Sequence, residues 1–575
     1  MDETLLLMKT KNKFLSLAAL AAIVLSCTKD TDKTNQNFSS DSTPLAELVV
    51  PQTFNWSSSI KGNVEVIIDA PSYLTTEGQP VELHDEDGNL LDEQTVTNSS
   101  VTFNVTRPQT EGKIFAYYPN TDEQVEITSE KVVLELQDVS LDGLSSNLFK
   151  PGKKTGTKNK TQGTNMVNNG DFSSSTFPLD TTIYTKLRTL GTWYARDNNG
   201  ATTTVNGNAV FTSSNPSSKA DILQGFAVDG NFMFDFNYDF AGNGGFFVLL
   251  YDINKNFVGY TTVYTSGNTG HTNFITSPSV RFIQLYGFCA QGAWLDNVSL
   301  VETVEPDDDG DGVPNRKDAF PNDPLRAYKT SFPTLGKQIL AFEDLWPSTG
   351  DYDFNDLVIE NTVEFRKNAN NNLVDAVVKV KVLGLGAGLS SGLGIHLLKS
   401  DKQTFSTNII SAVNGSTASI DPAINNGIIV FNDDRKALKP FYNNNGFGPS
   451  GAPQTFTFTI TFNSNAGSQY ILPDFYIYRT SERGREIHQS GFPATAAANT
   501  ALIGTNSDNG SYRTHNGLPW VVEVVSPNAE FFRHPIEKVD MGEAYPKFKA
   551  WAQSNGKRYI GWMLLGKAEK LYTIN

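Results

Sequence analysis

Apolar and polar residues alternate in short segments along most of this chain. Residues 63–69, 81–84 and 101–105 follow this pattern, and a period of two places every second side chain on one face of a β-strand. Residues 87–89, Asp-Gly-Asn, separate two of these segments and are typical of a hairpin turn. A helical period appears only at residues 536–554. We therefore predict an all-β protein with several β-sandwich or jelly-roll domains in tandem, joined by linkers, and with a short C-terminal helix that caps a sheet.

The N-terminus has the features of a targeting signal. Lys9, Lys11 and Lys13 precede an apolar stretch at residues 14–25, which is shorter than the roughly 20 residues that a membrane span needs. Residues 24–27, Val-Leu-Ser-Cys, resemble a bacterial lipobox. The resemblance implies that the Cys27 thiol is lipidated and anchors the protein in a membrane. Thr28 follows in place of the Asp of an inner-membrane retention signal, and Lys29, Asp30 and Asp32 resemble the charged signals of lipoproteins on the outer face of the outer membrane, so we expect the protein on the cell surface. An ordinary secretory signal that contains a cysteine is the alternative.

The net charge and the cysteine count restrict the possible partners and cross-links of the chain. The formal net charge is −16 over 575 residues, which excludes a nucleic-acid binder because such proteins need a basic surface. Cys27 and Cys289 are the two cysteines, so lipidation of the first leaves no intrachain disulfide.

Residues 307–318 have the ligand order of a twelve-residue calcium loop. Gly312 stands at position 6, where the sharp turn favours a residue without a Cβ. The expected ligands are the side chains of Asp307, Asp309, Asp311 and Asp318, the backbone carbonyl of Val313, and Asn315 through a water molecule. With its continuation to Pro324, the segment resembles a thrombospondin type 3 calcium repeat that has Phe320 in place of a cysteine. A hydrated acidic linker is the alternative.

The segment 165–302 is predicted to be a jelly roll. Its two ends, residues 166–172 and 294–300, resemble those of galactose-binding-like carbohydrate-binding modules. Phe and Tyr alternate with polar residues at 232–240, which predicts a buried face of a sheet. Sugars stack on exposed aromatic rings. The candidate glycan contacts are therefore aromatic residues outside that stripe, namely Trp193, Tyr194 and Tyr264.

The C-terminal segment 336–575 carries several ordered motifs. Residues 341–347 and 350–359, with later segments such as 483–488 and 512–520, resemble the LruC domain of bacterial lipoproteins. The resemblance implies a surface or outer-membrane lipoprotein and little about biochemical activity.

A second acidic cluster lies in this half. Asp351, Asp353 and Asn355 would share one side of an extended strand, with Asp356 on the other. Crowded carboxylates repel one another unless they are hydrated or bound to a metal, so we predict a calcium site, to which Glu343, Asp344 and residues 433–434 could add ligands. The alternative is an Asx-turn that leads into a strand.

Catalytic motifs are missing from the sequence. The histidines lack HExxH spacing, no GxSxG segment exists, and no Cys–His couple is available. We therefore predict no catalytic residues. The alternatives are a glycan-acting hydrolase with an unrecognised active site and a structural envelope lipoprotein.

These patterns divide the chain into seven parts. They are a signal peptide with its lipidated cysteine at 1–27, a flexible tether at 28–47, a β-sandwich at 48–137, a polar linker at 138–164, the jelly roll at 165–302, a calcium-binding linker at 303–335 and the LruC-like domain at 336–575. We predict a non-catalytic outer-membrane lipoprotein that is stabilised by calcium, attached to the membrane by lipid, and binds a glycan or another surface protein.

Overall fold

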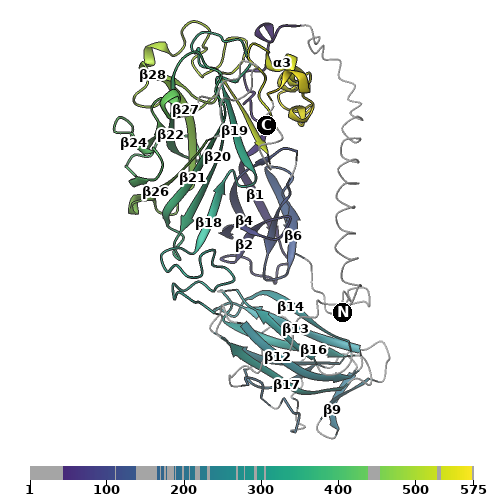
Figure 1. Cartoon of the computed structure of the whole chain (residues 1–575). Coiled ribbons are helices and arrows are strands. Elements are labelled where there is room, and N and C mark those ends of the chain that lie inside the picture. The colour runs from purple at the N-terminus through teal and green to yellow at the C-terminus, as the bar shows by residue number, and fades with distance from the viewer. Residues whose placement is uncertain are drawn as a thin grey trace, which may run out of the picture.

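The computed structural model describes residues 43–136 except 111, most of 165–303, 306–437, 454–526 and 532–572. The described strands form six sheets, which pair face to face around three apolar cores. This confirms the predicted all-β class. Figure 1 shows the jelly roll at one end of the molecule and the C-terminal sheets at the other, with the N-terminal sandwich between them. Cys27 and the predicted linker 138–164 lie outside the described residues.

The N-terminal sandwich contains a three-stranded sheet in the order β4-β1-β7 and a four-stranded sheet in the order β3-β2-β5-β6. In β1 the alternation predicted from the sequence buries Val64, Val66 and Ile68 between the sheets. The strands are β1 Ser59–Asp69, β2 Pro80–Asp85, β3 Leu90–Thr95, β4 Ser100–Pro108, β5 Ile114–Tyr118, β6 Glu123–Glu126 and β7 Lys131–Glu135.

The jelly roll consists of two five-stranded sheets, β15-β12-β17-β10-β9 and β14-β13-β16-β11-β8. Phe234, Phe236 and Tyr238 of β12 are buried between them, and the Phe236 ring meets Phe246 edge-on with centroids 4.9 Å apart. The strands are β8 Tyr194–Arg196, β9 Gly200–Val205, β10 Asn208–Ser213, β11 Ala220–Ala227, β12 Met233–Ala241, β13 Asn243–Tyr251, β14 Phe257–Ser266, β15 Gly270–Ile275, β16 Phe282–Cys289 and β17 Trp294–Thr303.

The C-terminal domain pairs a seven-stranded sheet, β23-β26-β21-β20-β19-β29 with β18 beside β20, with the five-stranded sheet β24-β25-β22-β27-β28. The largest core lies between them. The strands are β18 Tyr328–Phe332, β19 Lys337–Phe342, β20 Leu357–Lys367, β21 Leu373–Gly384, β22 Ser391–Lys399, β23 Ile410–Asn414, β24 Ser419–Ile420, β25 Gly427–Phe431, β26 Thr455–Phe462, β27 Ile471–Arg479, β28 Glu482–Ile487 and β29 Val521–Ser526.

The helical elements among the described residues are all short. They are α2 Asp434–Ala437, α3 Met541–Ala544, α4 Phe548–Gln553, and the 3-10 turns η2 Leu45–Glu47, η5 Ser464–Ala466, η6 Thr500–Leu502, η8 Trp562–Leu564 and η9 Ala568–Lys570. The single helix predicted near 536–554 is divided in two. The break falls at Tyr545, which is extended (φ −122°, ψ 92°) because Pro546 follows it and disfavours a helical conformation in the residue before. The two helices pack on β19 and β29.

Residues 43–58 form a strap that joins the N-terminus to the C-terminal domain. Val50 N–H donates to Asn516 O at 2.9 Å, and Trp56 Nε1 donates to Gly517 O at 2.8 Å. Leu45 and Leu48 are both 1 % exposed and share an apolar core with the C-terminal helices. The end of the predicted flexible tether is therefore ordered, and the expected boundary at residue 47 is wrong because apolar side chains on both sides of it enter one core.

The N-terminal sandwich also packs directly on the jelly roll. Leu249, Tyr251 and Phe257 of the jelly roll join the core of the N-terminal sandwich. Tyr118 donates its hydroxyl to Val258 O at 3.1 Å, and Tyr260 N–H donates to Asn120 O at 2.7 Å. The jelly roll is thus held by an apolar contact as well as by the chain that leads into it.

Candidate calcium sites

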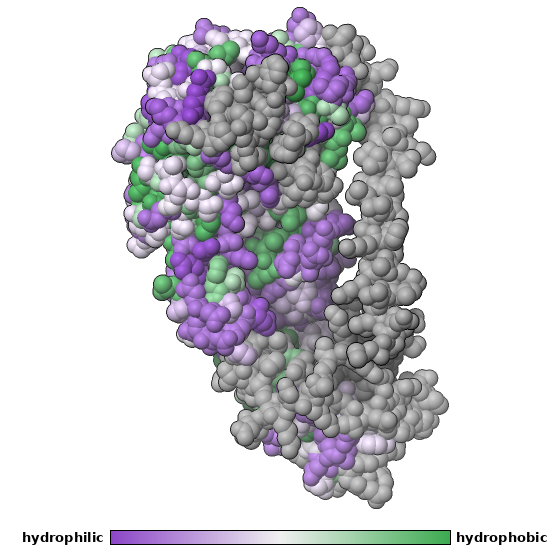
Figure 2. Space-filling view, in the orientation of Figure 1, coloured by the Kyte–Doolittle hydropathy of each residue, from purple (hydrophilic) through white to green (hydrophobic). Residues whose placement is uncertain are grey.

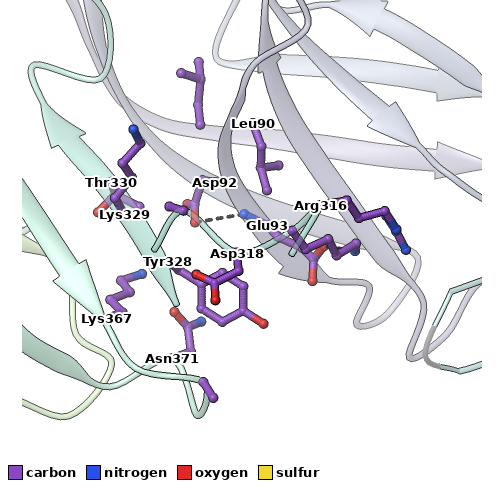
Figure 3. A pocket seen from close by; sticks show the side chains of 14 residues that line it. Leu90, Asp92, Glu93, Arg316, Asp318, Tyr328, Lys329, Thr330, Lys367 and Asn371 are labelled. Atoms are coloured by element: carbon purple, nitrogen blue, oxygen red, sulfur yellow. Dashed lines mark hydrogen bonds and ion pairs between the residues drawn. The ribbon is translucent and has the colours of Figure 1, made fainter. Parts of the chain in front are cut away.

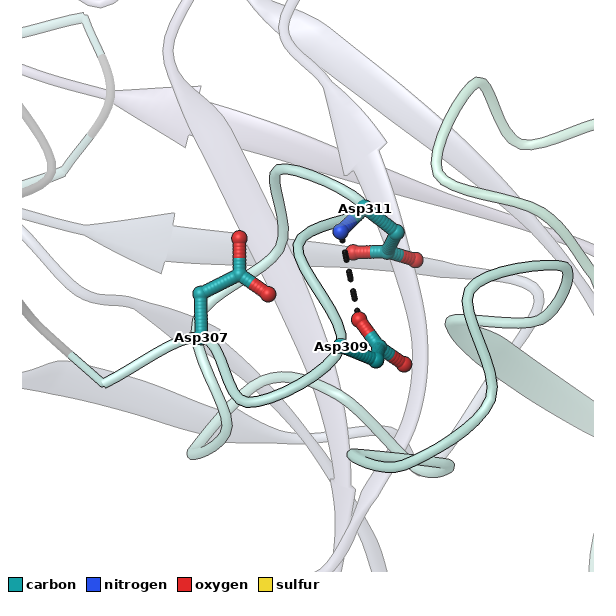
Figure 4. Close-up of side chains that lie close together, drawn as sticks. All are labelled: Asp307, Asp309 and Asp311. Atoms are coloured by element: carbon teal, nitrogen blue, oxygen red, sulfur yellow. Dashed lines mark hydrogen bonds between the residues drawn. The ribbon is translucent and has the colours of Figure 1, made fainter.

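The loop at 307–318 is ordered by its own carboxylates (Figure 4). Asp307 accepts the amides of Gly310 at 2.8 Å and Gly312 at 3.0 Å through its two oxygens. Asp309 Oδ1 accepts the Asp311 amide at 3.2 Å. Gly310 and Gly312 have φ of 76° and 96°, a region that L side chains rarely adopt. These bonds curl the backbone so that the acidic side chains face one another.

Three carboxylate oxygens of this loop are buried without a hydrogen-bond partner among the described residues. They are the Oδ2 atoms of Asp309, Asp311 and Asp318. Asp307, Asp309 and Asp311 each offer one oxygen within 4.8 Å of the others. Asp318 is 7 % exposed, and burial together with the negative charges of Asp311, Asp309 and Asp307 raises its pKa. A buried carboxylate without a partner is costly, so this arrangement suits a hard cation with oxygen ligands.

Asn315 and Val313, the other two predicted ligands of this loop, also make contacts that shape its backbone. Asn315 Oδ1 accepts the Asp308 amide at 3.0 Å, which closes the loop and commits that oxygen to the backbone. Val313 packs its side chain inside, at 4 % exposed, and donates its amide to Asp311 Oδ1 at 2.8 Å.

The loop is attached to both neighbouring domains. Lys317 reaches β2 and β3 of the N-terminal sandwich, with Nζ 3.1 Å from Glu82 Oε1 and 2.8 Å from Glu93 Oε2. Arg326 pairs with Asp323 at 2.6 Å and donates Nε to Asp375 of β21 at 2.9 Å. Figure 3 shows the cavity between β3 and β18 that Asp318 and Arg316 help to line. The order of this loop therefore affects how the two domains are joined.

The second cluster forms where β19 ends. Glu343, Asp351 and Asp353 each offer one oxygen within 4.8 Å of the others. The predicted extended strand is wrong, because Tyr352 and Phe354 have φ of 60° and 50°. These left-handed residues turn both rings into the core of the strap, and Asp353 is only 2 % exposed.

Backbone amides orient the carboxylates of this cluster. Glu343 Oε1 accepts the Phe354 amide at 2.8 Å, and Asp353 accepts Asn355 N at 3.2 Å and Lys538 N at 2.9 Å. Asp356, also predicted here, turns its Oδ2 to the Asp344 amide at 2.7 Å instead. Asn355 is fully buried, and its Nδ2 lies 3.4 Å from Pro535 O.

Ionisation of this cluster is unfavourable without a cation. Burial, followed by the charges of Asp356 and Asp353, raises the pKa of Glu343. Burial and the charge of Asp351 raise the pKa of Asp353 to about 7. Burial raises the pKa of Asp344 to about 6. A bound cation would offset both the desolvation and the repulsion.

Two glycines outside the predicted ligand set leave room for the side chains of this site. A Cβ on Gly350 would lie 1.7 Å from Glu343 Oε2, and one on Gly386 would lie 2.0 Å from Asn355 Oδ1. Glycine allows this close approach of backbone to side chain. The expected contribution of residues 433–434 is wrong. Asp433 pairs with Lys436 at 3.1 Å, and Asp434 Oδ2 accepts the Ser391 amide at 3.1 Å.

Residues 371–563 match a family described as a domain of unknown function, DUF4842. The match lies within the half of the chain that resembles the LruC domain, and it includes neither acidic cluster. No curated protein matches the chain.

Several solved structures are similar at low identity. A Bacteroides ovatus protein, provisionally described as a lipoprotein, is 16 % identical with a TM-score of 0.33, over 60 % of this chain and 100 % of its own. A CBM4 structure is 13 % identical with a TM-score of 0.19, over 24 % of this chain and 99 % of its own. A calcium-binding mutant of Bacteroides uniformis beta-glucuronidase 2 is 14 % identical with a TM-score of 0.13, over 42 % of this chain and 30 % of its own. Likenesses at this level carry no argument about function.

Of the three predicted glycan contacts, Trp193 is buried. Trp193 is 3 % exposed and packs on Phe172 with ring centroids 5.5 Å apart, so its proposed contact with sugar is wrong. The Gly and Asn residues near it suggested an exposed loop, whereas Trp193 is part of the jelly-roll core. Tyr194 is half-buried in the edge strand β8. Tyr264 lies in β14, and its side chain is outside the described part.

A buried charge network lies in the C-terminal domain. His488 Nδ1 is 2.7 Å from Asp474 Oδ2 and its Nε2 is 3.1 Å from Glu486 Oε2, and none of the three is exposed. Burial opposes the charge on His488, but Asp474 and Glu486 raise its pKa to about 9. Arg483 donates to Glu486 Oε1 at 2.5 Å. These groups pair with one another within the core.

No helix in the parts of the chain that the structure describes combines the length and the apolar character that a membrane crossing requires.

Proposed function

We propose that this protein is a non-catalytic lipoprotein of the outer membrane, exposed on the cell surface, whose domains are stabilised by calcium and which captures a glycan or a protein partner. Cys27 carries the lipid, and the loop at 307–318 and the cluster at 343–353 bind calcium. The C-terminal half belongs with the LruC-like domains, and the jelly roll presents the binding surface.

The observation that carries the calcium assignment is the set of buried oxygens without partners in the loop. Asp309, Asp311 and Asp318 each hold one buried carboxylate oxygen without a hydrogen-bond partner among the described residues, while the carboxylates of Asp307, Asp309 and Asp311 accept backbone amides of the loop. Calcium takes six to eight oxygen ligands, and such a loop provides several of them from nearly consecutive residues.

Calcium titration of the chain from residue 27 onward, with Cys27→Ser, tests the assignment. Extracellular modules bind calcium with Kd values of about 0.1–1 mM. At ten times Kd a single site stabilises the fold by about 1.4 kcal/mol, so the melting temperature should rise with calcium. Magnesium should be a weak substitute because it demands octahedral geometry.

Matched variants separate the two sites. Asp309→Asn with Asp311→Asn should remove one class of calcium heat, and Glu343→Gln with Asp353→Asn the other. Asp252→Asn is the control, because Asp252 orders a turn through the Asn256 amide at 2.8 Å and belongs to neither cluster. Absence of calcium heat, with melting unchanged by EDTA, would show that both are hydrated acidic turns.

The capture role requires a separate test. A glycan array probed with the same chain should show binding, and assays on the bound polysaccharides should show no cleavage. Cleavage would favour the glycan-acting hydrolase, whereas a chain without glycan or protein partners would favour a structural envelope lipoprotein.

A further inference from the structure

A cluster of apolar side chains is exposed near the C-terminus. Ile560, Leu564 and Leu565 are 37 %, 50 % and 50 % exposed. They lie in a tight turn around η8, where Trp562 N donates to Tyr559 O and Leu565 N to Trp562 O. Trp562 and Met563 are buried in the core of the strap, so the turn presents its remaining apolar residues outward. We call the surface of residues 557–567 the C-terminal patch.

Basic residues surround these apolar side chains. Residues 547–570 contain Lys547, Lys549, Lys557, Arg558, Lys567 and Lys570 but only one acid, Glu569, in a chain of net charge −16. Lys557 and Lys567 are exposed. Lys547 Nζ and Arg558 Cζ lie 5.0 and 5.3 Å from the centre of the Tyr559 ring. Lys570 pairs with Glu543, the nearest acid of α3. The patch therefore combines apolar side chains with an excess of positive charge.

The patch lies at the end of the molecule where the chain leads to the lipidation site. Lys549 Nζ donates to the carbonyl of Thr43, the first described residue, at 2.6 Å. Thr43 is sixteen residues from Cys27, a distance of at most about 58 Å even if fully extended. Figure 1 shows this end opposite the jelly roll, and in Figure 2 apolar and polar surface adjoin there.

Rigid packing holds the patch in place. Trp551 lies between Phe54 of the strap and Trp562, with ring centroids 4.8 and 5.2 Å away. Trp56 contacts Phe548 at 5.6 Å. The strap and the turn that carries the patch therefore share one aromatic core and present a fixed surface.

We propose that the C-terminal patch docks on a lipid surface with anionic headgroups. Leu564, Leu565 and Ile560 enter the boundary between headgroups and acyl chains, and Lys557, Arg558 and Lys567 contact the headgroup phosphates. The inference rests on the proposed lipid anchor, which raises the effective concentration of the patch at the membrane. The charge of the patch and the position of Thr43 favour lipid over a protein occupant. In this orientation the jelly roll points away from the membrane.

Vesicle sedimentation of the chain from residue 27 onward with Cys27→Ser tests the patch without its anchor. This chain retains every described residue. The lipid is phosphatidylcholine, alone or with about 30 % phosphatidylglycerol, a fraction that gives a strongly negative surface. We expect binding to the anionic vesicles, reduced by added salt, and much weaker binding to phosphatidylcholine alone.

Variants of exposed residues identify the surface. Each basic residue near an anionic membrane contributes about a fivefold effect on partitioning, so Lys557→Glu with Lys567→Glu should lower partitioning at least about 25-fold. Leu564→Ser with Leu565→Ser should lower it on the same vesicles. Leu325→Ser with Lys379→Glu is the matched control, because Leu325 is 65 % exposed and Lys379 is an exposed residue of β21. An unchanged melting curve checks that each variant is folded.

The outcomes distinguish this inference from the anchor. Equal binding of patch and control variants, or no binding to anionic vesicles, overturns the patch. Fatty-acid labelling of the wild type but not of Cys27→Ala tests the anchor independently. A patch that binds while Cys27 remains unlabelled would overturn the anchor alone. Pull-down of a protein by the patch with no vesicle binding would make the occupant a protein and sink the proposal.

Discussion

Lys317 Nζ lies 3.1 Å from Glu82 Oε1, which joins the candidate calcium loop to the N-terminal sandwich. Both side chains are nearly buried. Burial opposes ionisation of Glu82, but a hydrogen bond with His84 and the charge of Lys317 lower the pKa of Glu82 to about 2. Asp318, which offers one of the unpartnered oxygens, is the next residue in the chain. Calcium that fixes Asp318 would therefore also fix the lysine that holds the neighbouring domain.

Replacement of Lys317 by Met should uncouple the N-terminal sandwich from the loop. Removing one partner of a buried ion pair costs about 3 kcal/mol, because Glu82 and Glu93 are left without their cation. Differential scanning calorimetry should show an earlier transition for the sandwich, and calcium should no longer shift it while calcium heat persists. Lys113→Met is the control, since its pair with Glu126 is exposed. Equal calcium shifts in both variants would contradict the coupling.

The buried histidine predicts a loss of stability in alkaline solution. The folded pKa of His488 is about 9 and its ordinary value is 6.5, so its contribution is complete below pH 6.5 and is lost as pH rises through 9. The free energy of unfolding should fall by about 3 kcal/mol over this range. Urea unfolding from pH 6 to 10 should show this decline for the wild type. His488→Gln should be less stable, and its free energy of unfolding should change less between pH 6 and 10. His515→Gln, at an exposed position, should follow the wild type.

The acidic cluster predicts a second pH dependence, which calcium should remove. The pKa of Asp353 is about 7 in the fold against an ordinary 3.8. Its contribution is complete below about pH 4 and is lost as the pH rises through 7, because the ionised form is destabilised. In EDTA the free energy of unfolding should fall by at least about 2 kcal/mol from pH 4.5 to 8. With saturating calcium the fall should largely disappear, and a fall that calcium leaves unchanged would contradict a metal at this cluster.

Gly350→Ala should damage the same cluster. A Cβ there would overlap Glu343 Oε2, so the carboxylate must move away from Asp353. We expect loss of one class of calcium heat and a destabilisation of about 1–3 kcal/mol from the clash. Gly388→Ala is the control, because its Cβ would meet nothing within 4 Å. Normal calcium binding by Gly350→Ala would show that Glu343 is not a ligand.

The sequence predicted the features that are set by residues close together in the chain, and missed the contacts between distant segments. The alternation in residues 63–69 predicted β1, and the spacing of Asp307, Asp309 and Asp311 predicted that their carboxylates converge. Glu343 lies beside Asp353 because β19 ends next to the turn that carries Asp353. The sequence named Glu343 as an additional ligand, but the separation of the two residues along the chain does not fix whether they meet. The aromatic pair Phe54 and Trp56 was the available sign that the strap enters a core, but its partners, Phe548 and Trp551, are nearly 500 residues away in the sequence.

The strap has a consequence for the order of events during folding. Residues 43–58 share their core with residues 541–571, which lie about 500 positions later in the sequence, as well as with β19 and β29. Domains generally fold from the N-terminus as the chain emerges, but this contact joins residues that are about 500 positions apart in the sequence. The aromatic side chains of the strap must therefore stay in water until residues 541–571 are available to cover them. A chain that ended before residue 541 would leave Phe54 and Trp56 of the strap without their aromatic partners Phe548 and Trp551.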